Sequence, residues 1–232
     1  MSTKKPLEGY KVVDFSAVFA GPICSRYLLD CGADVIKVET PAVGDLTRGV
    51  DGISRVFSHF NAGKRSIAVN LKSEAGQILV KRLISDADIV IENFRPGIMA
   101  KFGLDYESLK KENPKLVYCS ISGFGQSGPY VNRAAYAPIV HAASGFDSVQ
   151  TSAQGDENLR PPNWDIMVAD ILTGTYAFAA IQSALLGLER HGVGELIDVS
   201  MMESMMSLIP AHIQAAQMEE PAVIGRFHPV KV

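Results

Sequence analysis

The sequence predicts an α/β fold, in which helices flank a mostly parallel, Rossmann-like sheet. Two observations predict this class. Short apolar segments alternate with helical patterns through the first half of the chain, as in α/β proteins. The first two apolar segments are joined by a loop, a helix and a glycine, in the order of a β–α–β unit. The 232 residues suffice for one large domain or two small ones.

The β–α–β unit is the most informative part of the chain. It consists of a strand at 11–15, a loop at 16–22, a helix at 23–31 closed by Gly32, and a strand at 34–38. In open α/β sheets, the loop after the carboxyl end of a strand faces the ligand crevice. The loop at 16–22 is therefore the first place to expect a ligand, and its small residues would let the backbone approach it closely.

The later segments continue this alternation and then depart from it. Expected next are a polar loop at 42–58, a strand at 66–70, a helix capped by Ser73 and ending near 85, a strand at 89–92, one or two short helices at 98–111 with a break at Gly103, and a strand at 116–122. Expected after these are loop and short helix at 130–162, an apolar helix at 167–188, a strand at 196–199, and a helical stretch at 201–218 kinked or split by Pro210.

Composition excludes several classes of protein. The formal net charge is -3, from 22 Lys and Arg against 25 Asp and Glu, which predicts no general attraction to nucleic acid or to an anionic membrane. Cys24, Cys31 and Cys119 are an odd count without paired spacing, which indicates a reducing compartment. The first ten residues lack an apolar segment typical of a secretory signal, so we expect a cytoplasmic protein.

One apolar segment, 167–188, is long enough to cross a bilayer. It contains Asp170 and several small residues that suit close helix packing. A buried helix is therefore the expected structure, and no membrane partner is predicted.

The first unit also carries a resemblance to a known family. Asp14-Phe15, the Ala-Gly-Pro at 20–22 and the run GADVIKVE at 32–39 resemble the start of the class III CoA-transferases, which include formyl-CoA transferase, carnitine CoA-transferase and α-methylacyl-CoA racemase. The resemblance implies a Rossmann-like fold that forms interlocked homodimers. It also implies that 1–218 is the N-terminal part of a CoA-binding large domain, and that 219–232 begins a linker to a second domain absent from this chain.

Asp170 is the candidate catalytic residue. From the residues alone, an acid at the start of an apolar helix is more often a complement to the helix dipole. The resemblance reverses this interpretation, because an Asp followed by a nearby Gly, a small-residue helix and a Gly-x-Gly strand marks the nucleophile of the family. Here these are Asp170, Gly174 and Gly192-Val193-Gly194. The implied reaction moves CoA between an acyl-CoA and a small carboxylic acid through aspartyl anhydride and aspartyl-CoA intermediates.

The resemblance also implies where CoA binds. From the residues alone, the segment ENFRPG at 92–97 is as typical of a Pro-Gly turn as of a binding loop, and Lys72 and Lys101 are typical surface residues. The matching CoA-binding positions are Phe19, Ala20, Val69, Lys72, Asn93, Phe94, Arg95, Lys101 and Tyr136. Thr40 departs from the pattern, since some members have an arginine near this strand end; Arg48 or Arg65 could compensate.

Tyr136 separates the branches of the resembled family. The racemase branch has a His followed by Asp here, and that His carries the α-proton; this chain has Tyr136 followed by Ala137. A phenol with an ordinary pKa of about 10 is poorly suited to that task, so a transferase is favoured over a racemase. A catalytically inactive member stays an alternative.

Two other classes of function have weak support. The turn SAVFAGP at 16–22 lacks the glycine pattern of a dinucleotide-binding oxidoreductase. The histidines His141, His191 and His212 have no metal-ligand spacing and read as structural or surface residues, so no metal is expected.

Overall fold

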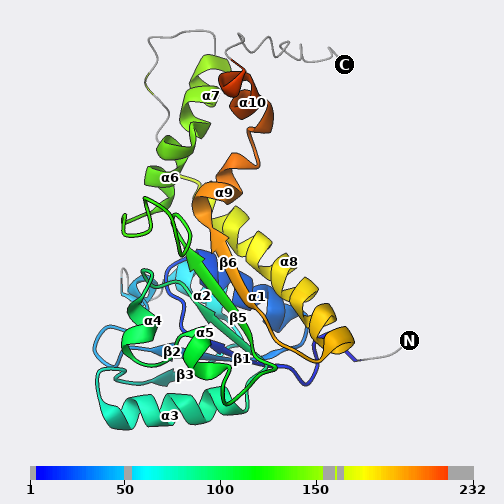
Figure 1. Ribbon diagram of the computed structural model, residues 1–232. Coiled ribbons are helices and arrows are strands. Elements are labelled where there is room, and N and C mark those ends of the chain that lie inside the picture. The colour runs from blue at the N-terminus through cyan, green and yellow to red at the C-terminus, as the bar shows by residue number, and fades with distance from the viewer. Residues whose placement is uncertain (1–3, 50–53, 154–159, 161–164, 219–232) are drawn as a thin grey trace.

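The computed structural model describes residues 4–49, 54–153, 160 and 165–218. Its centre is a six-stranded sheet of order β3-β2-β1-β4-β5-β6, in which every pair of neighbouring strands is parallel. The strands are β1 (Lys11–Asp14), β2 (Asp34–Glu39), β3 (Arg65–Ala68), β4 (Ile89–Glu92), β5 (Val117–Ser122) and β6 (Leu196–Ser200). This confirms the predicted α/β class with a parallel sheet (Figure 1).

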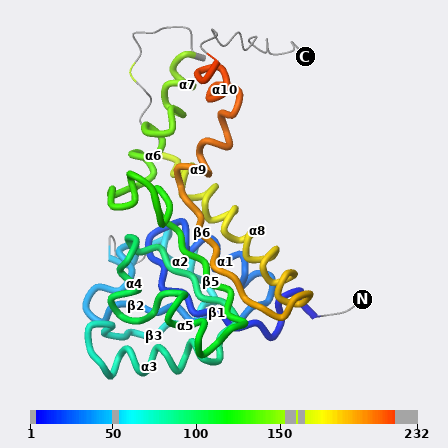
Figure 2. Tube along the Cα trace, in the orientation of Figure 1, coloured from blue at the N-terminus to red at the C-terminus, as the bar shows by residue number. Residues whose placement is uncertain are grey.

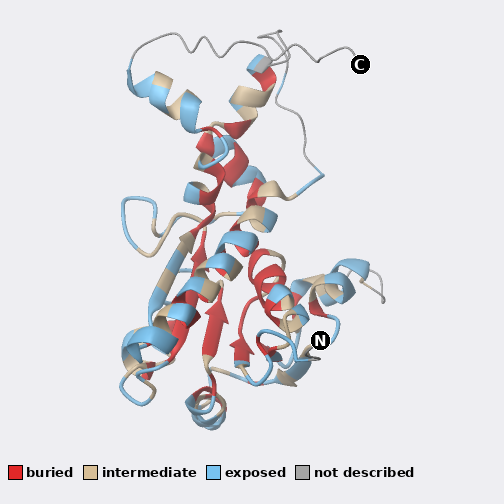
Figure 3. Ribbon diagram, turned by 90° about the vertical axis from the view of Figure 1, so that its right-hand side faces the viewer, coloured by how far each residue is buried: buried red, intermediate tan, exposed pale blue. Residues whose placement is uncertain are grey.

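Helices cover both faces of the sheet because its central strands are apolar on both faces. In β1, Val12 belongs to one buried cluster and Val13 to the other, as expected from the alternation of side chains along a strand. The first cluster is completed by α1 (Ala20–Asp30) and α8 (Val168–His191). The second is completed by α3 (Glu74–Ser85), α4 (Ile98–Lys101) and α5 (Tyr106–Leu109). Buried residues concentrate in these strands and in the helix surfaces facing them (Figure 3).

A group of helices stands beyond one end of the sheet, and we call it the helical extension. It comprises α6 (Ala137–Ser144), α7 (Phe146–Ala153), α9 (Met201–Met206), α10 (Pro210–Gln217) and the first turns of α8. A third apolar cluster holds it together, with residues from α6, α8 and α9. The backbone trace shows α8 returning from the extension along the sheet (Figure 2). The extension therefore covers the edge where several strands end.

The long helix α8 has the length and composition of a membrane span. In the structure it packs closely on α1, and Gly174 lies at the contact: a Cβ added there would lie 2.5 Å from the Ala20 carbonyl oxygen. The small residues of the apolar segment therefore serve close helix packing, as the sequence predicts.

The structure corrects one sequence expectation, confirms a second and does not describe the residues of a third. The expected loop at 42–58 contains a short 3₁₀ turn, Leu46–Arg48, and the start of α2 (Arg55–Asn61). The Ser54 side chain caps α2 by accepting a hydrogen bond from the Phe57 N–H, a signal that the sequence contains. Pro210 divides the last helical stretch as expected, because it starts α10. The expected linker at 219–232 lies outside the described residues.

Candidate active site

A cavity of about 320 Å³ lies where β1, β4 and β5 end, beneath the helical extension. It is lined by the loop after β1, the segment after β4, the end of β5, the segment before α6, and the starts of α8 and α9. Six of the ten predicted site residues line it together: Ala20, Asn93, Phe94, Arg95, Tyr136 and Asp170. The cavity therefore lies at the crevice position expected for an open α/β sheet.

Asp170 is placed at the start of two helices. It lies in the first turn of α8, and its carboxylate accepts a hydrogen bond from the N–H of Ala20, the first residue of α1. Burial raises the pKa of Asp170 and this hydrogen bond lowers it, which leaves a value of about 6. The result is a carboxylate that is poorly hydrated yet largely ionised near neutral pH.

The loop after β1 is held in a strained conformation. Val18 has a φ of 71°, in the left-handed region that a β-branched residue seldom adopts. Its N–H donates to both carboxylate oxygens of Asp45, at 3.3 and 3.2 Å. Asn93 fixes the preceding residue, because it accepts from the Ala17 N–H at 2.9 Å and donates to the Ala17 carbonyl at 2.8 Å. Since both amides already have acceptors, this part of the loop provides shape to the cavity wall rather than free N–H donors.

Beneath this loop is a buried network of charges. Lys37 pairs with Asp45 at 3.0 Å and donates to the Ser16 carbonyl at 2.6 Å. Lys64 pairs with Asp14 at 3.2 Å, and all four charged side chains are at most 1% exposed. Burial alone would raise the pKa of Asp14, but Lys64, Lys37 and two serine hydroxyls lower it to about 2. Since Lys64 also donates to the Pro22 carbonyl at 3.1 Å, both ends of the loop backbone are tied to buried ion pairs.

Glu92, at the end of β4, is a second buried acid near the cavity. It accepts hydrogen bonds from the Ser120 hydroxyl and from the Phe94 N–H, the latter at 2.8 Å. Burial outweighs these bonds and raises the pKa of Glu92 to about 7. The carboxyl group thus orders the turn that presents Asn93 and Phe94 to the cavity.

The other four predicted site residues do not line this cavity. The Phe19 ring packs on Phe60, with centroids 5.5 Å apart, and Val69 is buried in the apolar cluster shared with α3. Lys72 and Lys101 are exposed, before α3 and at the end of α4. Their roles in binding CoA stay predictions.

The two arginines that could replace a basic residue at Thr40 are already paired. Arg48 binds Glu39 through two nitrogens, at 2.6 and 2.7 Å, and lies 3.8 Å from the centre of the Phe57 ring. Arg65 forms an ion pair with Asp34. Both guanidinium groups therefore serve contacts within the fold.

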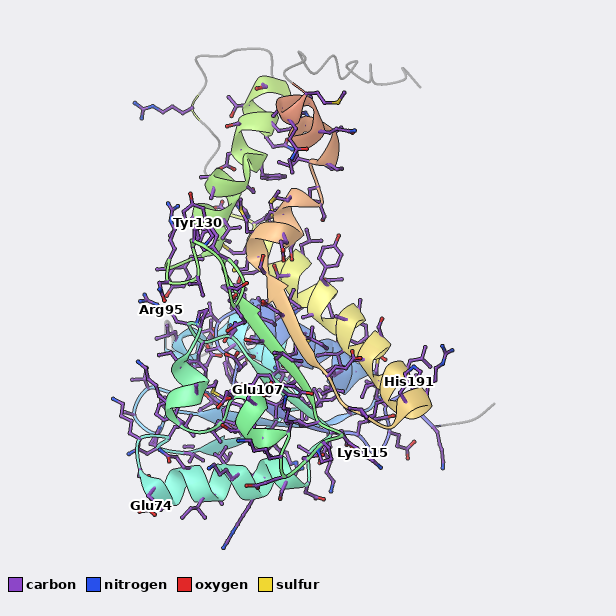
Figure 4. The ribbon with its side chains drawn as sticks, viewed as in Figure 1. Glu74, Arg95, Glu107, Lys115, Tyr130 and His191 are labelled. Carbon is purple, nitrogen blue, oxygen red and sulfur yellow. The ribbon has the colours of Figure 1, made fainter. Side chains whose placement is uncertain are left out.

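Arg133 lines the cavity and was missed by the sequence reasoning. Its guanidinium lies 5.8 Å from the centre of the Phe124 ring and 5.6 Å from that of Tyr130. Within the described part of the chain it has no carboxylate partner. Tyr130 and Arg95 project on the same side of the molecule, between the sheet and the extension (Figure 4). The signal in the sequence that could have identified it was its position, three residues before the predicted site residue Tyr136.

Among the described residues, no group of three or more His, Cys, Asp or Glu side chains is placed to hold a metal ion.

The fold and the cavity define an α/β protein with a partly desolvated carboxylate at the carboxyl ends of parallel strands. Residues 7–231 match the sequence model of CoA-transferase family III, and the chain belongs to this family. This confirms the resemblance seen in the first β–α–β unit.

Characterised relatives and a solved structure support this assignment. The chain is 47% identical over 211 residues to succinate–glutarate CoA-transferase of Agrobacterium fabrum, covering 86% of this chain and 52% of the relative. It is 39% identical to acetyl-CoA:oxalate CoA-transferase of Acetobacter aceti, covering 97% of this chain and 59% of the relative. A CAIB/BAIF family protein from Brucella suis is 42% identical with a TM-score of 0.85, covering 94% of this chain and 60% of that one. The chain thus spans about half the length of the curated relatives it matches.

Proposed function

We propose that this chain carries the nucleophile and part of the CoA site of a CoA-transferase, which moves CoA from an acyl-CoA thioester to a carboxylic acid. The observation that carries the proposal is the placement of Asp170. Its carboxylate is partly buried in a cavity at the strand ends and adjoins the first N–H of α1. Family membership supplies the class of reaction.

In the proposed reaction, a carboxylate oxygen of Asp170 attacks the carbonyl carbon of the acyl-CoA. The carbon–sulfur bond breaks, CoA leaves as a thiolate, and a mixed anhydride forms. The thiolate then attacks the Asp170 carbonyl carbon, which releases the first acid and leaves an aspartyl-CoA thioester. The acceptor carboxylate reverses both steps, so the new acyl-CoA departs and Asp170 is regenerated with no net proton change.

The electrostatics of Asp170 suit this role. With a pKa of about 6, roughly nine in ten molecules carry the ionised nucleophile at pH 7. Partial burial removes part of the hydration that makes a carboxylate in water a weak nucleophile. The N-terminus of α1 stabilises negative charge at the same position.

The surrounding side chains offer contacts for a thioester substrate. We propose that Asn93, Phe94, Arg95 and Tyr136, which share the cavity with Asp170, hold the part of CoA near the sulfur. Lys72 and Lys101, exposed on the surface, would attract its phosphates. Ala20 gives its N–H to the nucleophile, so its role is closer to catalysis than the sequence reasoning assigned.

We further propose that the acceptor is a dicarboxylic acid. The names of the relatives from Agrobacterium fabrum and Acetobacter aceti include succinate, glutarate and oxalate. Arg133 lines the cavity and has no carboxylate partner in the described part of the chain, so it is available to bind the distal carboxylate. Replacing Arg133 with Ala should raise the KM for a dicarboxylate more than for its monocarboxylate analogue; equal effects on both would refute this role.

We propose a cytoplasmic protein, because its three cysteines are free and lack paired spacing. We also propose a homodimer, because the resembled family forms interlocked dimers. Sedimentation analysis of the purified protein tests the dimer, and a monomer at micromolar concentration would contradict it.

The proposed function is tested by trapping the acylated enzyme. The protein is mixed with succinyl-CoA, quenched in acid and analysed by peptide mass spectrometry. The expected result is an adduct on the peptide that contains Asp170, which the Asp170→Asn variant lacks while it still binds CoA by calorimetry. Asp30→Asn, on the exposed end of α1, is the matched control and should keep the adduct. Full turnover by Asp170→Asn would refute the assignment.

A further inference from the structure

The first turn of α8 is built without a cap from its own sequence. The preceding residue, Met167, forms no side-chain hydrogen bond to the helix. The Val168 N–H is satisfied by the Ile166 carbonyl at 2.9 Å. The next N–H, on Ala169, belongs to a residue that is 0% exposed, so water does not reach it. A helix end buried in this way requires an acceptor from elsewhere in the fold.

His141 supplies that acceptor from α6. Its Nε2 accepts a hydrogen bond from the Ala169 N–H at 3.0 Å, one residue before Asp170. The imidazole is 1% exposed and its ring centre lies 5.7 Å from that of Phe146. Because Nε2 accepts, the proton of the neutral ring must be on Nδ1. Nδ1 is buried and has no hydrogen-bond partner among the described residues.

We propose that His141 is a positioning residue for Asp170: its neutral imidazole fixes the first turn of α8 and thereby holds the carboxylate in the cavity. A protonated His141 would present an N–H to the Ala169 N–H, so only the neutral ring can perform this task. That holding Asp170 matters for catalysis rests on the proposed function; the structural link itself does not.

The surroundings of His141 favour the neutral ring. Burial lowers the pKa of His141, and the negative charge of Asp147 on α7 opposes that shift. On α8, the acid next to the Ala169 contact is Asp170. On α9, the one charged residue is Glu203, which is exposed. Since the folded pKa lies below the ordinary value, the contribution of His141 to stability is present at neutral pH and is lost as pH falls below about 6.5.

The test measures the coupling between the two residues directly. The pKa of Asp170 is measured by ¹³C NMR of the labelled carboxyl group, and the Asp170→Asn variant assigns the resonance. The protection of the Ala169 N–H is measured by hydrogen exchange. In His141→Leu, which removes the acceptor, the Ala169 N–H should lose protection. The first turn should then admit water, and the pKa of Asp170 should fall by about one unit towards its ordinary value of about 3.9.

Two further variants separate positioning from general packing. His141→Gln places an amide oxygen near the position of Nε2 and should restore both measurements, and it should keep the Ala169 protection factor in acid, where the wild type loses it. Phe146→Leu disturbs the same cluster without removing the acceptor and should leave the pKa of Asp170 unchanged. If His141→Leu leaves both the Ala169 protection and the Asp170 pKa at wild-type values, or if Phe146→Leu shifts that pKa equally, the inference is wrong.

The rate of adduct formation tells this inference apart from the proposed function. His141→Leu should slow acylation of Asp170 by on the order of 10²-fold, the usual effect of a misplaced reacting group, and His141→Gln should recover most of the rate. If the wild type forms no adduct but His141→Leu still shifts the pKa of Asp170 and exposes the Ala169 N–H, the proposed function fails and the positioning role stands. If the adduct forms and the coupling is absent, the reverse holds.

Discussion

The two walls of the cavity are held in place by different forces. On the sheet side, the loop after β1 is tied to the buried ion pairs Lys37–Asp45 and Lys64–Asp14. On the extension side, the first turn of α8 is held by an apolar cluster and by one neutral imidazole, His141. The comparison shows that the cavity depends on buried charges at one wall. At the other wall it depends on apolar packing and on the protonation state of the His141 imidazole.

Removing a charge beneath the loop should have the largest effect. Lys64→Met leaves Asp14 buried without its closest cation, and breaking a buried ion pair typically costs about 3–5 kcal/mol. Urea denaturation at pH 7 measures the loss. Lys11→Met, which breaks an exposed pair with Asp86, is the matched control and should leave the midpoint nearly unchanged. Equal midpoints for both variants would contradict the importance of the buried network.

Glu92 should make the sheet side sensitive to rising pH. Its pKa is raised to about 7 in the fold, so its contribution to stability is full below its ordinary value of about 4.5 and is lost as pH rises through 7. Between pH 5 and pH 8 the wild type should lose about 2.5 kcal/mol more than Glu92→Gln, measured by urea denaturation. The exposed Glu107→Gln is the control; parallel pH curves for wild type and Glu92→Gln would refute the prediction.

The contact between the two walls is tested at Gly174. Its added Cβ would lie 2.5 Å from the Ala20 carbonyl oxygen, which is backbone and cannot rotate away, so Gly174→Ala should destabilise the fold by about 1–3 kcal/mol. In the same helix Gly187 has nothing within 4 Å of an added Cβ, and Gly187→Ala should stabilise by up to about 1 kcal/mol. Thermal unfolding measures both; the same sign for the two variants would argue against the close approach.

The smallest predicted effect concerns the proton state of Asp170. Because the nucleophile must be ionised and its pKa is about 6, acylation should rise with pH and level off above 7. At pH 5 the rate should be roughly tenfold below the plateau. Rapid-quench mass spectrometry of the adduct on the Asp170 peptide measures this rate at each pH. A midpoint near pH 4 would show a carboxylate that is fully hydrated.

The sequence predicts most of the fold because the signals for the strands are local. The apolar runs at β1, β4 and β5 were located to within one residue, and Ser73 was identified as a helix cap, which the structure confirms. The start of α2 was missed although Ser54 carries the same signal. Family resemblance was needed for Asp170, since an acid at a helix start is usually a dipole complement.

The remaining parts of the site depend on contacts between distant residues. Lys37 is a charged residue inside a strand, and its partner Asp45 comes from a separate loop, so the pairing cannot be read from the strand itself. Val18 is not a residue that sequence rules place in the left-handed region; the bonds to Asp45 fix it there. His141 reads as a structural histidine, and sequence alone does not show which helix end it satisfies.

The position of Asp170 between two helix starts has a consequence for the energy of an acylated enzyme. The partly buried surroundings favour an uncharged ester-like group on this side chain, whereas the α1 amide favours the bare anion. Burial outweighs the amide, since the pKa lies about two units above its ordinary value, which corresponds to roughly 3 kcal/mol in favour of the uncharged form. These surroundings would therefore favour an uncharged adduct on Asp170, while the α1 amide limits the cost of returning to the free anion, as a reversible exchange of partners requires.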